Sequence, residues 1–360
     1  MTLLQLVTTS RLKAYRACAR LHFYQYVENV RPIVDGEARS FGSLIHAGLE
    51  LWWMDTGAPL DAALDALERH HRDAIEAGAE PDEYRLAKAR ALLTGYDVRW
   101  RGEDLTAIAV EQEFRAPLTN PETNARSRTF DIGGKIDAIA RTGDGRTLIV
   151  EHKTSTEDIT PGSRYWRRLR MDGQISMYYD GAAALGYDVE GCIYDVLKTP
   201  QQKPYKATPE AARRYTTKAS RLKDGTLRPA GSLHAGQRDR DETVDEYGGR
   251  IMAAIAAAPD DYYQRGNVDR LDDEMREHHW DTWQHARSLR DALRTGVYPR
   301  NPDACDRYHR LCDFFEVCTG GAAIDDPTQF TRGDAHPELT QVAKEEPTHD
   351  DSEIEFGNPF

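Results

Sequence analysis

The sequence has no apolar run long enough to cross a membrane. Its longest apolar stretches, LIVE and IMAAIAAA, are far shorter than the roughly 20 residues that a membrane-spanning helix needs. The N-terminus also lacks the charged and apolar regions of a signal peptide. We therefore expect a cytoplasmic protein that makes no contact with membranes.

Positive charge is also in short supply, since the net charge of the 360 residues is −13. A protein that simply coats nucleic acid would carry the opposite sign. Residues 321–360 hold ten Asp or Glu against two Lys or Arg, with four prolines and few large apolar side chains. This composition predicts an acidic disordered tail over residues 326–360, behind a globular body at residues 1–325.

Cysteines are few, and five in a chain without an export signal do not indicate a disulfide framework. Cys192 stands alone in a strand pattern and is interpreted as a small core residue. Cys305, Cys312 and Cys318 lie within fourteen residues of one another, and Cys18 lies near the start of the chain. Three thiols so close together indicate a metal site.

Hydrophobic periodicity divides the chain into helical and extended regions. Helices are expected in residues 8–27, with Cys18 on the helix, and in residues 40–57, with His46 in the first turns. Further helices are expected twice between residues 60 and 100, at 171–188, in parts of 213–258 around an exposed insertion, and at 271–295. Strand patterns cover residues 106–118, 129–141, 146–154 and 192–198.

The turn TGDG at residues 142–145 allows the pairing of two strands to be estimated. A hairpin centred on Asp144 sets Asp137 opposite Glu151, with a register error of about one residue. Glu151 and Lys153 share a face of the sheet because they lie two residues apart. On the helix at 171–188, Gln174 and Tyr178 lie one turn apart.

Asp137, Glu151 and Lys153 stand in patterns that otherwise indicate buried strands, where a charged group needs a partner or a metal. Converging carboxylates bind Mg²⁺ or Mn²⁺ and leave coordination positions for water and a phosphate oxygen. A lysine beside them can orient or help deprotonate the attacking water and offset charge on the phosphate. The set predicts a phosphodiester hydrolase, although each residue alone would fit a strand edge or a surface ion pair.

An ordered series of motifs resembles the RecB-like branch of the PD-(D/E)xK nucleases. The matching pieces run from about residue 9 to residue 319: SRLKAYRACARLHFYQYV, FGSLIHAGLE, GGKIDAIA, EHKT, QISMYY and NPDACDRYHRLCDFFEVC. The resemblance implies an α/β fold with a restriction-endonuclease-like core, in which helices flank a central mixed β-sheet. It also implies a helical N-terminal region and an iron–sulfur staple that joins the N- and C-terminal parts.

The resemblance assigns roles to individual residues. His46, Asp137 and Glu151 would be ligands of Mg²⁺ or Mn²⁺, with the backbone carbonyl of His152 as a further ligand. Lys153 would be the catalytic lysine, and Gln174 with Tyr178 would orient the lysine or a DNA phosphate. Cys18, Cys305, Cys312 and Cys318 would hold a [4Fe–4S] cluster, for which zinc, or simply reduced core cysteines, are the alternatives.

A basic segment, SRYWRRLRMDGQ, precedes Gln174 and combines four arginines with Tyr165 and Trp166. Basic side chains interleaved with aromatic rings suit a track for single-stranded DNA, and an ordinary exposed helix start is the alternative. The arginines are Arg164, Arg167, Arg168 and Arg170, and Lys198, Lys203 and Lys206 would extend the track.

These observations predict a metal-dependent deoxyribonuclease, an exonuclease that acts on DNA ends or single strands in recombination, repair or phage DNA processing. The sequence holds no G-x-x-x-x-G-K-[ST] motif, so a helicase, an annealing protein or another recombination partner would assist it. A nuclease that trims spacers in CRISPR adaptation is an alternative. A non-enzymatic DNA-end-binding module of a repair complex is another.

Overall fold

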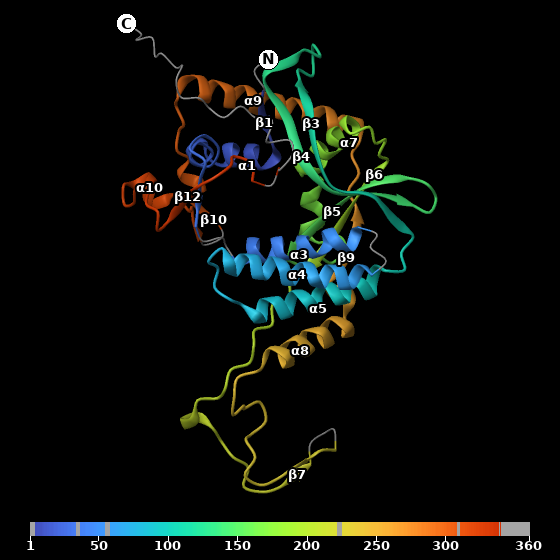
Figure 1. Cartoon of the computed structure of the whole chain (residues 1–360), viewed down its shortest axis with the longest axis vertical. Helices are drawn as coiled ribbons and strands as arrows, with labels where there is room; N and C mark the ends of the chain where they lie inside the picture. Colours follow the sequence, from blue (N-terminus) through green and yellow to red (C-terminus); the bar gives the residue numbers. More distant parts are fainter. Residues whose placement is uncertain are drawn as a thin grey trace.

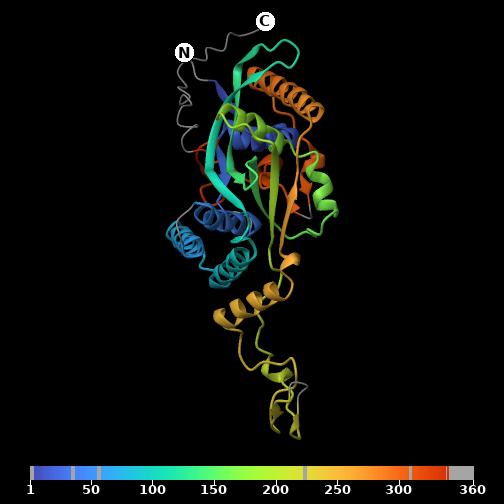
Figure 2. The same ribbon diagram turned by 90° about the vertical axis from the view of Figure 1, so that its right-hand side faces the viewer.

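The computed structural model describes residues 4–33, 37–54, 58–221, 225–307, 310–337 and 339. A mixed sheet of six strands lies between two groups of helices (Figures 1 and 2). Its strands are β1 (Gln5–Val7), β3 (Leu105–Thr119), β4 (Arg126–Thr142), β5 (Thr147–Ser155), β6 (Gly191–Lys198) and β9 (Tyr263–Asn267). The expected α/β fold with a central mixed sheet flanked by helices is confirmed, and it is consistent with a restriction-endonuclease-like core.

The long strand β4 organises the sheet. Strand β3 pairs antiparallel along one side of β4, while parallel β1 and antiparallel β5 share its other side. Strand β6 runs parallel to β5, and β9 closes the sheet antiparallel to β6. A parallel pair needs a crossover, which here contains α6 (Arg164–Leu169) and α7 (Gly173–Ala184). This crossover brings α7 next to β4 and β5, the strands that carry the predicted site.

Helices cover both faces of the sheet. One face packs against α3 (Glu37–Trp53), α4 (Pro59–Glu76), α5 (Glu83–Trp100) and α8 (Val244–Ala257). The other face packs against α1 (Thr9–Ala17), α6, α7 and α9 (Asp272–Thr295). Neighbouring residues of β5 enter different cores, Ile149 on the α7 side and Val150 on the α3 side. This two-sided burial explains the unbroken apolar run LIV in β5.

A third, smaller core joins the beginning and the end of the chain. Tyr24 stacks on Phe314, and Phe314 stacks on Phe330, with ring centroids 5.1 and 5.4 Å apart. The surrounding elements are β2 (Val30–Pro32), β10 (Asp306–Arg307), β11 (Arg310–Leu311), α10 (Phe315–Thr319), β12 (Phe330–Arg332) and the single turn η4 (Pro302–Ala304), whereas the turn η3 (Pro259–Asp261) lies between α8 and β9. Strand β12 pairs antiparallel with β2.

This third core changes where the body of the protein ends. The tail was expected to begin at residue 326, but Phe330 and Leu339 are buried. A large aromatic side chain and a strand pairing tie the first part of that segment to the body. Residues 340–360 lie outside the described residues.

The first helix was expected to run through Cys18, and this expectation is wrong. Cys18 has extended backbone angles, φ −163° and ψ 121°, and separates α1 from α2 (Ala19–His22), which continues into a π-helical turn, η1 (Phe23–Val27). Its N–H still closes the last turn of α1 on the carbonyl of Ala14, at 3.0 Å. The break turns the thiol toward Pro299 and Asn301 instead of into a helix face.

Residues 213–258 were expected to be helical in parts; α8 confirms this for the second half, whereas the described part of residues 213–243 contains no helix. After a short 3-10 turn, η2 (Glu210–Ala212), the chain forms a narrow hairpin with the two-residue strands β7 (Ser220–Arg221) and β8 (Leu227–Arg228). A helix here would have no apolar surface to pack on, because this segment projects beyond α8 (Figure 2). Within the described chain, no helix is both long and apolar enough to span a membrane.

Candidate active site

The predicted register between β4 and β5 is confirmed. The ladder pairs Ala138 with Val150 and Arg141 with Thr147, and its continuation sets Asp137 opposite Glu151. The ladder stops at this point because the N–H of His152 donates to Oδ2 of Asp137, at 2.8 Å. The N–H of His152 thus bonds to a side chain and not to the backbone of β4, and this bond fixes the orientation of the Asp137 carboxylate.

Three possible metal ligands from three elements meet at Asp137. His46 from α3, Glu111 from β3 and Asp137 from β4 each offer a ligand atom within 4.8 Å of the other two. Nδ1 of His46 lies 3.8 Å from Oδ2 of Asp137. Burial, followed by the charge of Lys153, lowers the pKa of His46 to about 3. The imidazole is therefore neutral, which is the form that binds metals.

Glu111 was not among the predicted site residues. It lies opposite Asp137, between the pairs Val110–Ala138 and Gln112–Ile136. Its backbone has φ 51°, a left-handed conformation that is strained for a residue with a side chain. Its carboxylate forms an ion pair with Lys135, and burial raises its pKa despite that pair.

An irregular register explains why sequence reasoning missed Glu111. Near the β3–β4 turn, Thr119 pairs with Arg126, and continuing that register would set Ile108 opposite Asp137. A register shift between Thr119 and Pro117 adds three residues to β4 and brings Glu111 to that position instead. The only signal in the sequence is a glutamate in a strand pattern, which many surface strands share.

Glu151 is fully buried beside this group but is not part of it. Its Oε1 accepts a hydrogen bond from Nε2 of Gln174, at 2.8 Å, and forms an ion pair with Lys153. Its Oε2 is also buried and has no hydrogen-bond partner among the described residues. Burial, and then repulsion from Asp137, raise the pKa of Glu151 to about 7.

Lys153 and the two α7 residues lie around Glu151. Burial opposes the charge of Lys153, but the carboxylates of Glu151 and Asp137 outweigh it and raise the lysine pKa. Nε2 of Gln174 also donates to the hydroxyl of Tyr178, at 2.8 Å. Gln174 is held at the start of α7 by Asp172, whose side chain accepts from its N–H at 2.9 Å. The structure thus brings all three predicted residues to Glu151.

His152 points to the other face of the sheet. Its buried ring lies 5.3 Å from the ring of Trp53, and Nδ1 lies 3.2 Å from Oδ2 of Asp195. The charge of Asp195 raises the pKa of His152, against the effect of burial, which is the larger single influence and lowers it. The predicted ligand is the backbone carbonyl, and that role stays a prediction.

The donor set suits a hard divalent cation. It combines a neutral imidazole with carboxylates, the oxygen-rich chemistry that Mg²⁺ and Mn²⁺ prefer. The unpartnered Oε2 of Glu151 gives a separate indication, because a buried carboxylate oxygen without a donor is costly unless a cation faces it. His46, Glu111, Asp137 and Glu151 are the residues that would hold such an ion.

The four cysteines predicted to share a metal come together at the third core. The N–H of Asn301 donates to the Sγ of Cys18, and its carbonyl lies 3.7 Å from the Sγ of Cys305. The N–H of Cys312 donates to the carbonyl of Cys305, at 2.8 Å, and Cys318 lies beside Tyr24. All four thiols are free, whereas Cys192 is buried in the main core as expected.

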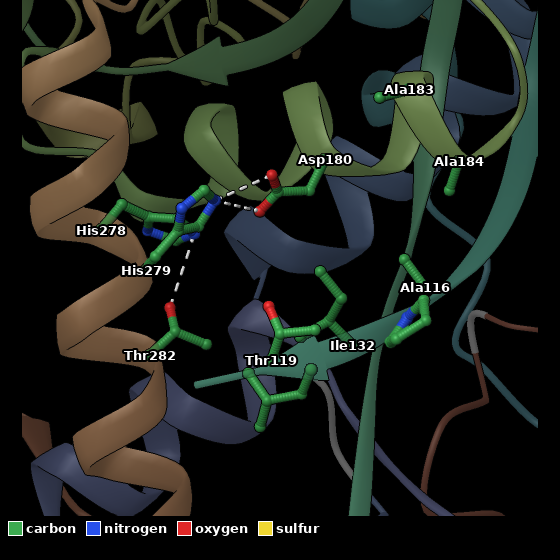
Figure 3. Close-up of a pocket in the computed structure, with 11 residues that line it drawn as sticks. Ala116, Thr119, Ile132, Asp180, Ala183, Ala184, His278, His279 and Thr282 are labelled. Atoms are coloured by element: carbon green, nitrogen blue, oxygen red, sulfur yellow. Dashed lines mark hydrogen bonds and ion pairs between the residues drawn. The ribbon is translucent and has the colours of Figure 1, made fainter. Parts of the chain in front are cut away.

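A separate cavity of about 300 Å³ lies behind α7, between that helix, α9 and the strands β3 and β4 (Figure 3). Asp180 on α7 accepts hydrogen bonds from His279 on α9, at 2.9 and 3.1 Å. The rest of the wall combines apolar side chains with the polar side chains of Thr119, His278 and Thr282. None of the predicted site residues lines it. The cavity is therefore distinct from the carboxylate site.

The aromatic residues of the predicted single-strand track lie in the core. Tyr165 is buried, and Nε1 of Trp166 donates to the carbonyl of Ile159, at 2.7 Å. The ring of Trp166 also packs closely on Gly266 of β9. Tyr165 cannot stack on a base in this arrangement, so that part of the expectation is wrong, and Trp166 is partly buried with its ring packed against the core. Four residues of the segment remain as exposed charges: Arg164, Arg167, Arg168 and Arg170.

A family model described as "PD-(D/E)XK nuclease superfamily" matches residues 7–319. A comparison with curated proteins finds no match. Among solved structures, a "Putative exonuclease" from Eubacterium rectale is 8% identical, with a TM-score of 0.42 and 90% of each chain covered. The structure of SSO0001 is 16% identical, with a TM-score of 0.20, and covers 54% of this chain and 72% of that one.

Both structural likenesses are too weak to carry an argument about function. The family model, by contrast, spans nearly the whole chain and includes every residue of the carboxylate site. The chain belongs to the PD-(D/E)XK nuclease superfamily.

Proposed function

We propose that the protein is a metal-dependent deoxyribonuclease whose active centre is formed by His46, Glu111, Asp137, Glu151 and Lys153. The observation that carries this proposal is the group of possible ligands formed by His46, Glu111 and Asp137, beside the buried Glu151 whose Oε2 has no hydrogen-bond partner among the described residues. Such a site binds a divalent cation and is poorly suited to any role without one. The family assignment supports the hydrolysis of phosphodiester bonds as the reaction.

Each residue has a distinct part in this reaction. A bound Mg²⁺ or Mn²⁺ would supply positive charge to the scissile phosphate and lower the pKa of a water molecule. Lys153, held as a cation by Glu151 and Asp137, orients the attacking water and offsets the negative charge that develops on the phosphate. Gln174 is a positioning residue, since it holds the same carboxylate oxygen that Lys153 contacts.

The finer assignment to DNA exonucleases of the RecB-like branch rests on the resemblance of the motifs. Their order, with a cysteine before the histidine helix and three more after the core, is typical of that branch. Cleavage at DNA ends or on single strands is accordingly the proposed mode, in recombination, repair or phage DNA processing. A helicase or an annealing protein is the proposed partner.

A [4Fe–4S] cluster held by Cys18, Cys305, Cys312 and Cys318 is part of the same proposal. The basis of this assignment is the order of the four cysteines in the motifs, since thiolates bind zinc as well as iron–sulfur clusters. The cluster would join α2 to the C-terminal segment.

The test is digestion of end-labelled single- and double-stranded DNA with Mg²⁺, Mn²⁺ or EDTA. We expect the wild-type protein to release labelled nucleotides with either metal and to be inactive in EDTA. Asp137→Ala should be inactive under every condition, while Asp144→Ala, in the turn of the same hairpin, should retain activity. Absence of metal-dependent cleavage by the wild-type protein on every substrate would refute the proposal.

A further inference from the structure

A projecting segment has a charge opposite to that of the rest of the molecule. Residues 201–241, here called the basic arm, extend past α8 at the end of the molecule opposite α9 (Figures 1 and 2). They contain ten Lys or Arg against four Asp or Glu, a net charge of +6. The remaining residues carry −19. An acidic nuclease repels nucleic acid unless such a segment supplies the attraction.

Hydrophobic burial does not explain the arm. No described residue between 201 and 241 is buried, and Tyr215 and Leu227 are 54% and 60% exposed. A segment of this size without a core gains little free energy by folding against itself. Its surface, not its packing, is therefore the property to be explained.

The base of the arm is nevertheless held firmly. Glu242 is 3% exposed and accepts hydrogen bonds from Arg250 at 2.8 and 2.7 Å and from the N–H of Tyr205 at 2.8 Å. The guanidinium of Arg250 lies 4.0 Å from the centre of the Tyr205 ring. The hydroxyl of Tyr84 on α5 donates to the carbonyl of Glu242, at 2.5 Å. These contacts fix the arm's exit from the body.

Near the base of the arm, acidic side chains form ion pairs with basic side chains, whereas other basic side chains of the arm have no acidic partner among the described residues. Asp241 pairs with Lys206, and Glu246 of α8 pairs with both Arg238 and Arg240. Further along the arm, Arg213 and Arg221 donate hydrogen bonds to backbone carbonyls. Arg214, Lys218 and Arg228 form neither an ion pair nor a side-chain hydrogen bond within the described part of the chain. Arg214 and Lys218 are exposed and Arg228 is partly exposed.

The arm follows the C-terminal end of β6, the strand that pairs with the part of β5 that carries Lys153. Val196 of β6 pairs with Lys153, and Lys198 pairs with Ser155, three residues before the arm starts. A strand of nucleic acid with its phosphate at Lys153 could therefore continue along the chain that leaves β6.

We propose that the basic arm binds the phosphate backbone of the nucleic acid substrate, with Arg214, Lys218 and Arg228 as contacts. This inference rests on the proposed function and adds to it the surface that holds the substrate outside the active centre. The attraction is to backbone charge, so it does not depend on base sequence.

The test measures binding of the full chain, in EDTA, to a labelled 40-nucleotide single strand and a 40-base-pair duplex at several salt concentrations. The variant carries Arg214→Gln, Lys218→Gln and Arg228→Gln. The matched control carries Arg287→Gln, Arg290→Gln and Arg294→Gln, which removes three charges from exposed positions on α9, at the other end of the molecule. Unchanged melting temperatures would show that both variants are folded.

We expect the arm variant to bind at least about tenfold more weakly at low salt, and the control to bind like the wild-type protein. The slope of log affinity against log salt should fall by roughly 2 to 3, since each phosphate contact contributes about 0.7 to 0.9. Equal affinities and slopes for the arm variant and the wild-type protein would overturn the inference, and would leave the arm as a surface for an acidic protein.

The same protein separates this inference from the proposed function. Binding that depends on the arm, without cleavage when Mg²⁺ or Mn²⁺ is added, would refute the nuclease proposal and leave the arm's role standing. Metal-dependent cleavage together with binding that does not depend on the arm would refute the role of the arm and leave the nuclease proposal standing.

Discussion

The amide of Gln174 joins Tyr178 to the buried carboxylate of Glu151 through two hydrogen bonds, each 2.8 Å long. Because the Tyr178 hydroxyl accepts one of them, it limits the directions in which the Gln174 amide can point. Gln174 in turn limits the position of Glu151 and of Lys153, which contacts the same oxygen. The orientation of the lysine therefore depends on a side chain that does not touch it.

Replacing Tyr178 with Phe should slow cleavage without removing it. The variant loses one neutral hydrogen bond, usually worth about 1 kcal/mol, so kcat should fall roughly fivefold with KM little changed. Steady-state kinetics on one oligonucleotide substrate provides the measurement. Tyr179→Phe, one residue further along α7 and outside these two hydrogen bonds, is the control. Identical rates for wild type and Tyr178→Phe would remove the hydroxyl from the positioning role.

Lys153→Ala should separate binding from chemistry. The side chain supplies charge during the reaction and is not a metal ligand, so Mn²⁺ and DNA affinity should persist while single-turnover cleavage slows by roughly 10²-fold or more. Asp137→Ala should instead lose Mn²⁺ binding and cleavage together. A Lys153→Ala enzyme that cuts at the wild-type rate would show that the Glu151–Lys153 pair is an ordinary ion pair within a strand.

Glu111→Gln should weaken the metal site, although the sequence alone did not point to this residue. Removing its charge while keeping its shape should lower Mn²⁺ affinity by roughly tenfold or more, on the scale of a lost interaction with a charged group. Calorimetric titration with Mn²⁺ tests this. Glu122→Gln, at an exposed position of the β3–β4 turn, should bind Mn²⁺ like the wild-type protein. Unaltered affinity in Glu111→Gln would restrict the ligands to the other three residues.

Cys312→Ala should affect the protein far more than Cys192→Ala. If four thiolates hold a [4Fe–4S] cluster, the purified wild-type protein should be brown and contain about four irons, and loss of one ligand should lower both iron content and melting temperature. Cys192→Ala removes only a small buried sulfur and should keep the iron. Colourless wild-type protein with stoichiometric zinc would contradict the cluster.

His22 should make the protein less stable in mild acid. It is fully buried and accepts a hydrogen bond from Arg11 at 3.1 Å, and burial, then the Arg11 charge, lower its pKa to about 3 from 6.5. Between these values the unfolded chain binds a proton that the folded chain does not, so stability falls as the pH falls. Between pH 7 and pH 5 the loss from this group is about 2 kcal/mol.

Urea unfolding at both pH values measures this loss. His22→Gln keeps an acceptor for Arg11 and should be less stable at pH 7 but lose about 2 kcal/mol less on acidification. His336, whose charge also lowers the pKa of His22, stays in place in both proteins. An unchanged pH dependence in the variant would assign the acid sensitivity to other groups.

Much of the fold and part of the site could be predicted from the sequence, because strand register and helical spacing are regular in these parts of the chain. The β4–β5 turn keeps one register from Arg141 to Ala138, so counting from the turn was enough to bring Asp137 to Glu151. Helical spacing likewise placed Gln174 and Tyr178 on one side of α7.

The features that could not be predicted from the sequence lie where the backbone is irregular or where distant residues meet. The shift near Pro117 displaced Glu111 from the position that counting would assign it. The helical pattern continues through Cys18, so nothing in the periodicity marks the extended residue there. Tyr165 and Trp166 read as surface aromatics because of their arginine neighbours, although α6 turns both rings inward. Each of these depends on contacts with residues distant in the sequence.

The pairing of β2 with β12 has a consequence for the order of events during synthesis. Thr331 meets Arg31 across about 300 residues of intervening chain, and Phe330 completes the aromatic stack on Phe314 and Tyr24. A ribosome releases Tyr24 and Val30 long before Phe314 and Phe330, so the two earlier residues lack their core partners until the later segment has emerged. The large sheet can form earlier, because its last strand, β9, ends at Asn267. The core shared by these two segments can therefore close only after the large sheet has all its strands, and a nascent chain stalled before Phe330 would leave that core open.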